Sequence, residues 1–200
     1  MANLNRPGGF SPVCLLNGSP YNGAVRMYSV ASTNGDAMFI GDPVKSSGTA
    51  DTNGIAGVTL GTAASAIRGI ITAIGTNARG GPYIAPGDLT LTSAPATKTV
   101  AYYVAVIDDP NVIFEVQEDT AQTALAAADV GLNIDFQAGT PGTGVKVSAF
   151  VLNQATKATT STLNCKLLGL TQRSDNAIGT NAKWLVLINA HELRGGVTGV

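Results

Sequence analysis

The sequence is poor in charge, and this argues against several classes of function. Lys, Arg, Asp and Glu make up 12% of its 200 residues, about half the usual share for a soluble protein. The formal net charge is −1, and no run of Lys or Arg occurs. The electrostatic surface that nucleic-acid binding requires is therefore missing, and we expect no nucleic-acid partner.

Residues that catalyse reactions or bind metals are also scarce. The chain has one histidine, His191, and two cysteines, Cys14 and Cys165. The cysteines lie far apart and form no C-x-x-C pair, so they predict neither a zinc site nor a redox motif. We expect both to be small buried hydrophobic residues, while a disulfide between them stays open. Two cysteines in so long a chain leave the compartment open as well. We expect no cofactor and no metal.

Long hydrophobic runs are absent. The first ten residues contain no hydrophobic signal region, and the longest apolar stretches fall well short of the ~20 residues that span a bilayer. We therefore expect neither secretion by a signal peptide of the common type nor a membrane partner.

Turn residues are abundant and indicate short strands. The chain has 24 glycines and 44% hydrophobic residues, and Asn-Gly is the dipeptide that best tolerates tight hairpin turns. Four such pairs occur in the first quarter of the chain, at Asn17-Gly18, Asn22-Gly23, Asn34-Gly35 and Asn53-Gly54.

Runs of β-forming residues between the turns predict the strands. These runs lie at residues 25–30, 37–40, 66–74, 100–107, 112–117, 145–152, 163–170 and 183–188. We expect the first two to pair as a hairpin. We expect a second hairpin between 100–107 and 112–117, joined by a turn at Asp108-Asp109-Pro110-Asn111.

Alternation along two of these strands predicts core residues. Phe114 and Val116 share one face of their strand, and Trp184, Val186 and Ile188 share a face of the last strand.

One helix candidate stands out, at residues 120–130. It is rich in alanine, with Asp119 or Thr120 as N-cap and Gly131 as stop. No helices alternate with the strands as a βαβ fold requires. The expected fold is all-β, a single-domain (1–200) antiparallel β-barrel or jelly-roll-like sandwich with at most one short helix. Residues 1–10 carry no strand pattern and are either a flexible N-terminal arm or a frayed terminus.

No catalytic signature accompanies the titratable residues. A nucleophile system would have to use His191, but no G-x-S-x-G elbow or papain-like cysteine motif occurs. We expect His191 to be a surface or interface residue. The glycine-rich segment 139–144 lacks the Lys-Ser/Thr ending of a P-loop and is interpreted as a loop. Ile-Gly-Thr-Asn-Ala occurs at residues 74–78 and again at 178–182, which we interpret as two similar turns rather than a duplication.

The carboxylates are scattered. Asp108 and Asp109 are expected to cap a turn, and Glu115, Glu118 and Asp119 to lie at a solvated strand end. No calcium-loop pattern is present. A glycosidase pair stays open, because two such carboxylates converge only in the folded protein.

Three segments carry a family resemblance. They are Phe39-Ile-Gly-Asp-Pro-Val44, the stretch Tyr102-Tyr-Val-Ala-Val-Ile-Asp-Asp-Pro-Asn-Val-Ile-Phe-Glu-Val-Gln-Glu-Asp119 and Ala182-Lys-Trp-Leu-Val-Leu-Ile-Asn-Ala-His191. These segments resemble small structural proteins of tailed bacteriophages, in particular capsid decoration or cement proteins. The resemblance implies a β-rich fold that binds the outside of an icosahedral shell as a homodimer or homotrimer, at junctions between capsomers. It carries over no individual functional residue.

The expected function follows from charge poverty and this resemblance. We expect a structural virion protein, not an enzyme, whose partner is the major capsid protein. It is made in the host bacterial cytoplasm and located on the capsid exterior. The alternative is a receptor- or glycan-binding fibre or spike module, for which Tyr21 and Tyr83 are the suggestive aromatic residues. A small hydrolase is the third hypothesis.

Overall fold

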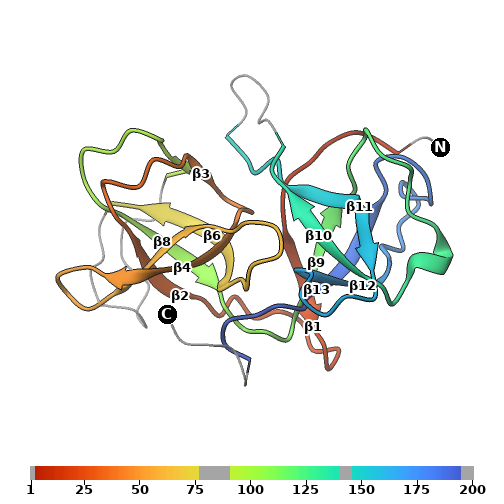
Figure 1. The fold of residues 1–200 in the computed structure, drawn as a ribbon, viewed down its shortest axis with the longest axis horizontal. Helices are drawn as coiled ribbons and strands as arrows, with labels where there is room; N and C mark the ends of the chain where they lie inside the picture. Colours follow the sequence, from red (N-terminus) through yellow and green to blue (C-terminus); the bar gives the residue numbers. More distant parts are fainter. Residues whose placement is uncertain (1–2, 77–90, 140–145, 195–200) are drawn as a thin grey trace.

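The structure is a computed structural model that describes residues 3–76, 91–139 and 146–194. It is all-β, with antiparallel sheets in a sandwich-like arrangement, which confirms the expected fold class. Figure 1 shows two lobes side by side, which we call the barrel lobe and the sheet lobe.

The barrel lobe is a closed sheet of five strands in the order β2-β5-β4-β6-β8. Its closure comes from β2, which pairs antiparallel with β8 and parallel with β5. A two-stranded sheet of β3 and β7 accompanies the barrel. The strands are β2 (Arg26–Val30), β3 (Met38–Phe39), β4 (Pro43–Ala50), β5 (Ala56–Leu60), β6 (Gly69–Gly75), β7 (Ser93–Ala94) and β8 (Tyr102–Ile107).

The sheet lobe has six strands in the order β1-β9-β13-β12-β10-β11. An isolated parallel bridge between Glu118 and Leu152 brings the end of β9 back to β11, so the sheet curls toward closure. The strands are β1 (Ser11–Leu15), β9 (Val112–Gln117), β10 (Asn133–Gln137), β11 (Val151–Ala158), β12 (Cys165–Leu170) and β13 (Lys183–Ile188).

The barrel is inserted between two neighbouring strands of the other lobe. All barrel strands fall between β2 and β8, whereas β1 precedes them and its partner β9 follows them. Leu15 pairs with Val112, and the Leu16 amide donates to the Asn111 carbonyl at 2.7 Å. The chain therefore enters and leaves the barrel at nearly the same place.

Most predicted strands are confirmed individually, but both predicted hairpins are wrong. β2 pairs with β5 and β8, while β3 pairs with β7. β8 and β9 lie in different lobes. The predicted turn between them does form, since the Val112 amide donates to the Asp109 carbonyl at 3.2 Å. It carries the chain from one lobe to the other instead of folding it back. The strand expected at 145–152 lies later, at β11.

The predicted helix at 120–130 is also wrong. Only one 3-10 turn, η1 (Ala127–Asp129), forms there. Carboxylates bind the amides that a helix would use: Glu118 Oε2 accepts from Leu125 N at 3.0 Å and Asp129 Oδ2 from Ala126 N at 2.9 Å. A helix of about three turns is marginal by itself, so these bonds are enough to replace it.

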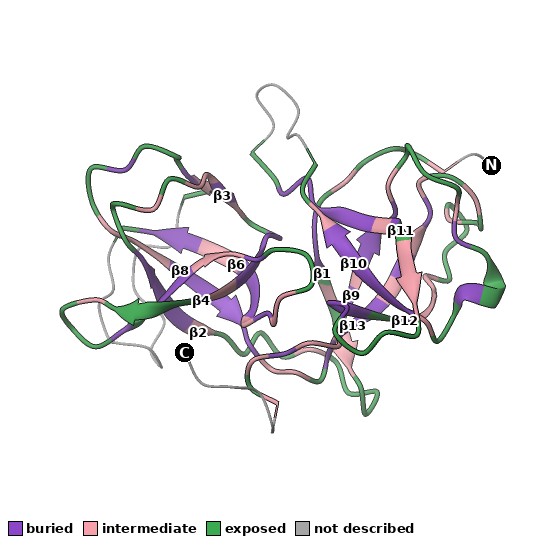
Figure 2. Ribbon diagram, in the orientation of Figure 1, coloured by how far each residue is buried: buried purple, intermediate pink, exposed green. Residues whose placement is uncertain are grey.

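Two hydrophobic clusters fill the lobes, and one of them crosses between the lobes. The first lies within the barrel. The second fills the sheet lobe and reaches the barrel through Ile67, Ile70 and Ile107. Figure 2 shows that buried residues concentrate on the strands of both lobes. The residues predicted to face the core are all buried: Phe114, Val116, Trp184, Val186 and Ile188. That the chain forms one domain stays a prediction. The two lobes share a hydrophobic core, but each lobe has its own sheet.

Candidate functional site

The sequence predicts that His191 is a surface or interface residue, but the structure buries it within the chain. Its exposed fraction is 1%. After β13 the chain turns back across the barrel lobe, where the Ile67 amide donates to Ala190 O at 2.8 Å and the Glu192 amide donates to Ile67 O at 2.9 Å. This short parallel contact covers the imidazole ring.

The environment of His191 holds it neutral. Burial lowers its pKa to about 4, and the positive charges of Arg194 and Arg68 add to this effect. Nδ1 accepts a hydrogen bond from the Leu193 amide at 3.0 Å, so the ring proton lies on Nε2, which has no partner. Within the described ranges, no serine, threonine or cysteine side chain hydrogen-bonds to His191.

The carboxylates behave differently from one another. Asp109 caps its turn as predicted, accepting from Asn111 N at 2.8 Å. Glu118 was expected at a solvated strand end, and this is wrong: it is fully buried and accepts from Trp184 Nε1 at 3.1 Å. The reason is the bridge from Glu118 to β11, which covers this end of β9. Burial raises the pKa of Glu118.

Both cysteines are free, with Cys165 buried and Cys14 half-buried on β1. No group of three or more metal-ligating side chains occurs in the part of the chain that the structure describes. Tyr83 and most of segment 139–144 lie outside the described residues. Within the same ranges, no helix has the length and hydrophobicity to cross a bilayer.

A chain of charged and aromatic groups lies where the C-terminal segment crosses the barrel. Arg68 Nε lies 2.7 Å from Glu192 Oε2, and its guanidinium lies 5.7 Å from the centre of the Tyr28 ring. Tyr28 Oη donates to Asp108 Oδ2 at 2.6 Å, and Arg26 lies 2.8 Å from the same oxygen. Burial and the bond to Asp108 raise the pKa of Tyr28 to about 12, so this phenol stays protonated at neutral pH. We interpret the group as a structural link between the segment and the barrel.

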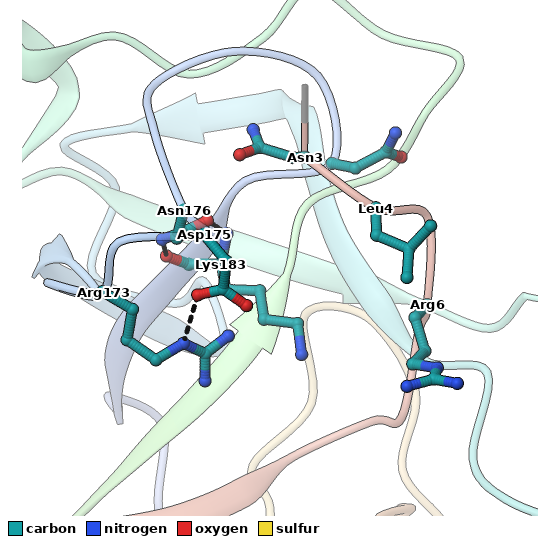
Figure 3. A pocket seen from close by; sticks show the side chains of 8 residues that line it. Asn3, Leu4, Arg6, Arg173, Asp175, Asn176 and Lys183 are labelled. Atoms are coloured by element: carbon teal, nitrogen blue, oxygen red, sulfur yellow. Dashed lines mark hydrogen bonds and ion pairs between the residues drawn. The ribbon is translucent and has the colours of Figure 1, made fainter. Parts of the chain in front are cut away.

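The candidate functional site is a pocket in the sheet lobe, beneath the N-terminal segment. Its volume is about 280 Å³. Figure 3 shows Asn3, Leu4 and Arg6 on one side of it and residues of the loop between β12 and β13 on the other. We call it the basic pocket; it is lined by Asn3, Leu4, Arg6, Arg173, Asp175, Asn176, Asn181 and Lys183.

Side-chain amides hold the N-terminal segment in place over the sheet. Asn3 exchanges two hydrogen bonds with the Ala177 backbone, at 2.8 and 2.9 Å. Gln117 donates to Asn5 Oδ1 at 2.9 Å and accepts from Arg6 N at 2.8 Å. The segment ends at Phe10, which is buried against Phe114 and Phe136. Residues 3–10, which the sequence assigned to an arm or a frayed end, are thus bound to the sheet lobe.

The opposite wall of the pocket is equally fixed. Asn176 donates to the carbonyls of Thr171 and Lys183, both at 2.8 Å, and accepts from the Lys183 amide at 2.9 Å. These bonds close the loop between β12 and β13 on itself.

The charged groups of the pocket are unequally paired. Arg173 donates to both oxygens of Glu115, at 3.0 and 3.1 Å, and to Asp175 at 3.1 Å. Burial by itself would lower the pKa of Arg173, but these two carboxylates outweigh it and raise the pKa. Lys183 Nζ lies 3.5 Å from Glu115. The Arg6 guanidinium forms no ion pair or hydrogen bond with any residue that the structure describes.

Asn181 also has unused hydrogen-bonding capacity. It is half-buried, its Oδ1 has no partner, and its φ is +66°, an uncommon backbone conformation for a residue other than glycine. Arg6 and Asn181 thus both have hydrogen-bonding atoms without partners at this pocket. Together they can bind a group that accepts hydrogen bonds from Arg6 and either donates to or accepts from the side-chain amide of Asn181.

Sequence reasoning missed this pocket. Its residues come from positions 3–6 and 173–183, which meet only because the N-terminal segment packs on the sheet. No local motif joins them. The one available signal was the Gly-Thr-Asn turn at 179–181, which we interpreted only as a turn.

Comparisons with known proteins give no relative. No family model, no curated protein and no solved structure matches this chain.

Proposed function

We propose that this chain is a structural virion protein that binds the outer surface of an icosahedral phage capsid and stabilises contacts between capsomers. The observation that carries the proposal is the internal pairing of its few charges. The exposed residues that remain include many Thr, Asn, Ser and Gly, whose neutral groups cost less to desolvate than charged groups when another protein covers them.

The pairing extends over both lobes. Ion pairs join Arg26 to Asp108, Arg68 to Glu192, Lys157 to Asp129, Arg173 to Glu115 and Asp175, and Lys183 to Glu115. Other cations bind oxygen atoms within the chain: Lys98 Nζ donates to Asp36 O at 2.7 Å and Arg194 to Pro110 O at 2.9 Å. Few charges are left to be desolvated in an interface.

Two further features support the proposal. Large hydrophobic side chains are exposed on both lobes, including Leu4, Leu16, Ile40 and Ile178. The sequence also resembles decoration proteins in three segments, of which 102–119 forms β8, the lobe crossover and β9.

Co-sedimentation with empty shells tests the proposal. Shells of the phage that encodes this chain should carry the protein to the pellet, while their unassembled subunits should not bind it, because a site between capsomers exists only in the shell. Equal binding to free subunits, or no binding to shells, would refute the proposal.

Thermal opening of the shells gives a second readout of the same function. A ligand that binds only the intact state stabilises it by mass action. Decorated shells should therefore open at a higher temperature than bare shells, and the difference should grow with the concentration of added protein.

Glycan binding is the second candidate, on one observation. An open hollow of about 450 Å³ lies on the barrel lobe, lined by hydroxyl and amide groups of Thr33, Asn34, Ser46, Ser47 and Thr59 among others. Among the residues that the structure describes, no aromatic side chain lines this hollow, whereas ligand sites are usually rich in aromatic groups. The hydroxyl of Tyr21 is already bonded to Ala24 O at 2.7 Å. We therefore favour shell binding.

A further inference from the structure

We propose that the basic pocket receives an acidic side chain, Asp or Glu, from a loop of the shell subunit, and that Leu4 covers an apolar residue beside it. The inference rests on the proposed function, and it specifies the chemistry of the contact between this protein and the shell subunit.

Charge complementarity is the first argument. Arg6, Arg173 and Lys183 bring three positive charges to the pocket, and Glu115 and Asp175 bring two negative charges. One positive charge is left over, and it lies on Arg6, which has no partner among the described residues. A single carboxylate balances this charge, and the planar guanidinium binds carboxylates through paired N–H donors.

The two carboxylates also decide against a more highly charged ligand. Asp175 is exposed at the rim of the pocket, with a side-chain exposed fraction of 71%. A phosphate or a nucleic-acid backbone would approach this charge with more negative charge than Arg6 can neutralise. A singly charged side chain is therefore the better fit.

One exposed apolar side chain, Leu4, lines the pocket, and a second, Ile178, lies close to Leu4. Leu4 is exposed to 69% and Ile178 to 51%. The two lie close together, because Asn3 binds the carbonyls of Ala177 and Gly179 on either side of Ile178. The centres of protein–protein interfaces are typically apolar and enriched in arginine. An exposed leucine next to an arginine without a partner fits this composition.

Hydrogen bonds hold both walls of the pocket in the absence of a partner. They involve the side-chain amides of Asn3, Asn5 and Asn176. Binding therefore loses little conformational entropy in this protein. A volume of about 280 Å³ accommodates one side chain and not an element of structure, so the partner must present the acidic residue on a protruding loop.

Four single variants test the inference by co-sedimentation with empty shells. Arg6→Gln removes the free charge, and Leu4→Ser removes the apolar contact. Lys166→Gln and Val100→Ser are the matched controls, since Lys166 is an exposed cation outside the pocket and Val100 is an exposed apolar residue on the barrel lobe. The Arg6 and Leu4 side chains make no described hydrogen bond, so these variants should keep the wild-type melting temperature.

The expected results differ in affinity and in salt dependence. Arg6→Gln and Leu4→Ser should each weaken shell binding about tenfold or more, and the controls should stay within about twofold of wild type. Between about 50 and 300 mM salt, the affinity of Arg6→Gln should change less than that of wild type, while Leu4→Ser should keep the wild-type dependence.

A gain of affinity tests the sign of the charge. Asp175→Asn removes a negative charge beside the pocket and should strengthen binding of a carboxylate by about two- to fivefold. Weaker binding of this variant would show that the partner presents a cation, and this would overturn the inference.

The two proposals fail in different ways. If wild type binds shells and the Arg6 and Leu4 variants bind equally well, the pocket is not the contact, and shell binding stands. If wild type does not bind shells, the proposed function itself is wrong.

Discussion

Gly9 and Gly41 mark the place where the N-terminal segment passes between the lobes. Both have left-handed backbones, with φ of +67° and +94°. A Cβ at Gly9 would overlap the Ser148 side chain and the Gly41 carbonyl. The Phe10 amide donates to that same carbonyl at 3.0 Å, so the close approach also positions Phe10 in the core.

We therefore expect Gly9→Ala to destabilise the protein, with Gly8→Ala as the control. A Cβ at Gly8 meets nothing within 4 Å. Gly9→Ala should lower the free energy of unfolding by about 1–3 kcal/mol or more, because strain of the backbone and overlap add. Gly8→Ala should change it by less than about 0.5 kcal/mol. Denaturant titration of the two variants measures the difference. Equal stability would mean that the segment does not pack here.

At the scale of elements, the segment after β9 is organised by Glu118 and not by helix propensity. Its carboxylate accepts from Leu125 N and Trp184 Nε1, two buried donors from separate parts of the lobe. Asp129 then caps η1 and lies 2.7 Å from Lys157 Nζ of β11. Buried carboxylates thus replace the backbone bonds that a helix would have made.

Glu118→Ala should leave both donors without an acceptor and destabilise the protein by about 2–5 kcal/mol. Glu118→Gln keeps an acceptor oxygen and should lose less. Asp119→Ala is the control, because among the described residues the side chain of Asp119 accepts only from the Thr120 amide. Trp184 is the one tryptophan of the chain, so its fluorescence reports the change directly. A wild-type unfolding midpoint for Glu118→Ala would contradict this role.

Local patterns in the sequence predicted strands and their buried faces well. Alternation in β9 and β13 placed Phe114, Val116 and Trp184 in the core, where they lie. The pairing of strands could not be predicted in the same way. The turn at Asp109 suits a hairpin and a crossover between lobes equally, and only contacts remote in sequence decide between them.

Residues whose role depends on distant contacts were hardest to predict. His191 is buried because the chain returns to Ile67, and Glu118 because it meets β11. The basic pocket combines Arg6 with Lys183 through packing of the N-terminal segment. No spacing along the chain contains this information.

Considered as a whole molecule, the protein contains two buried groups with opposite pH dependence. Burial raises the pKa of Asp42 to about 6 from 3.8, although hydrogen bonds from Ser148 and the Phe39 amide oppose the rise. His191 has its pKa lowered from 6.5 to about 4, next to Arg194, Arg68 and Asp109. As pH falls from 6 to 3.8, Asp42 takes up a proton in the folded state before it does so in the unfolded state. The folded state therefore gains stability over this range. As pH falls from 6.5 to 4, His191 takes up a proton in the unfolded state before it does so in the folded state. The folded state therefore loses stability over this range.

Each effect is about 3 kcal/mol, at 1.36 kcal/mol per pKa unit, so in wild type the two nearly cancel. In Asp42→Asn the effect of His191 is no longer cancelled. The stability of this variant relative to wild type should therefore fall as the pH is lowered from 6.5 to 4. His191→Asn keeps an acceptor for the Leu193 amide, and its stability relative to wild type should rise over the same range. Chemical denaturation across pH measures both slopes. Parallel profiles for the three proteins would show that neither group titrates as described.

The insertion of the barrel between β1 and β9 sets an order of events at the ribosome. Every strand of the barrel has left the ribosome once Ile107 has emerged, so the barrel is expected to fold while the chain is still being translated. β1 is made first, yet its partner β9 is made after the whole barrel, and the strands of the sheet lobe follow. The segment at 190–194 is made after all of these strands, and with it Glu192 reaches Arg68 and the Ser46 amide. A nascent chain thus holds a folded barrel before the lobe that forms the basic pocket exists.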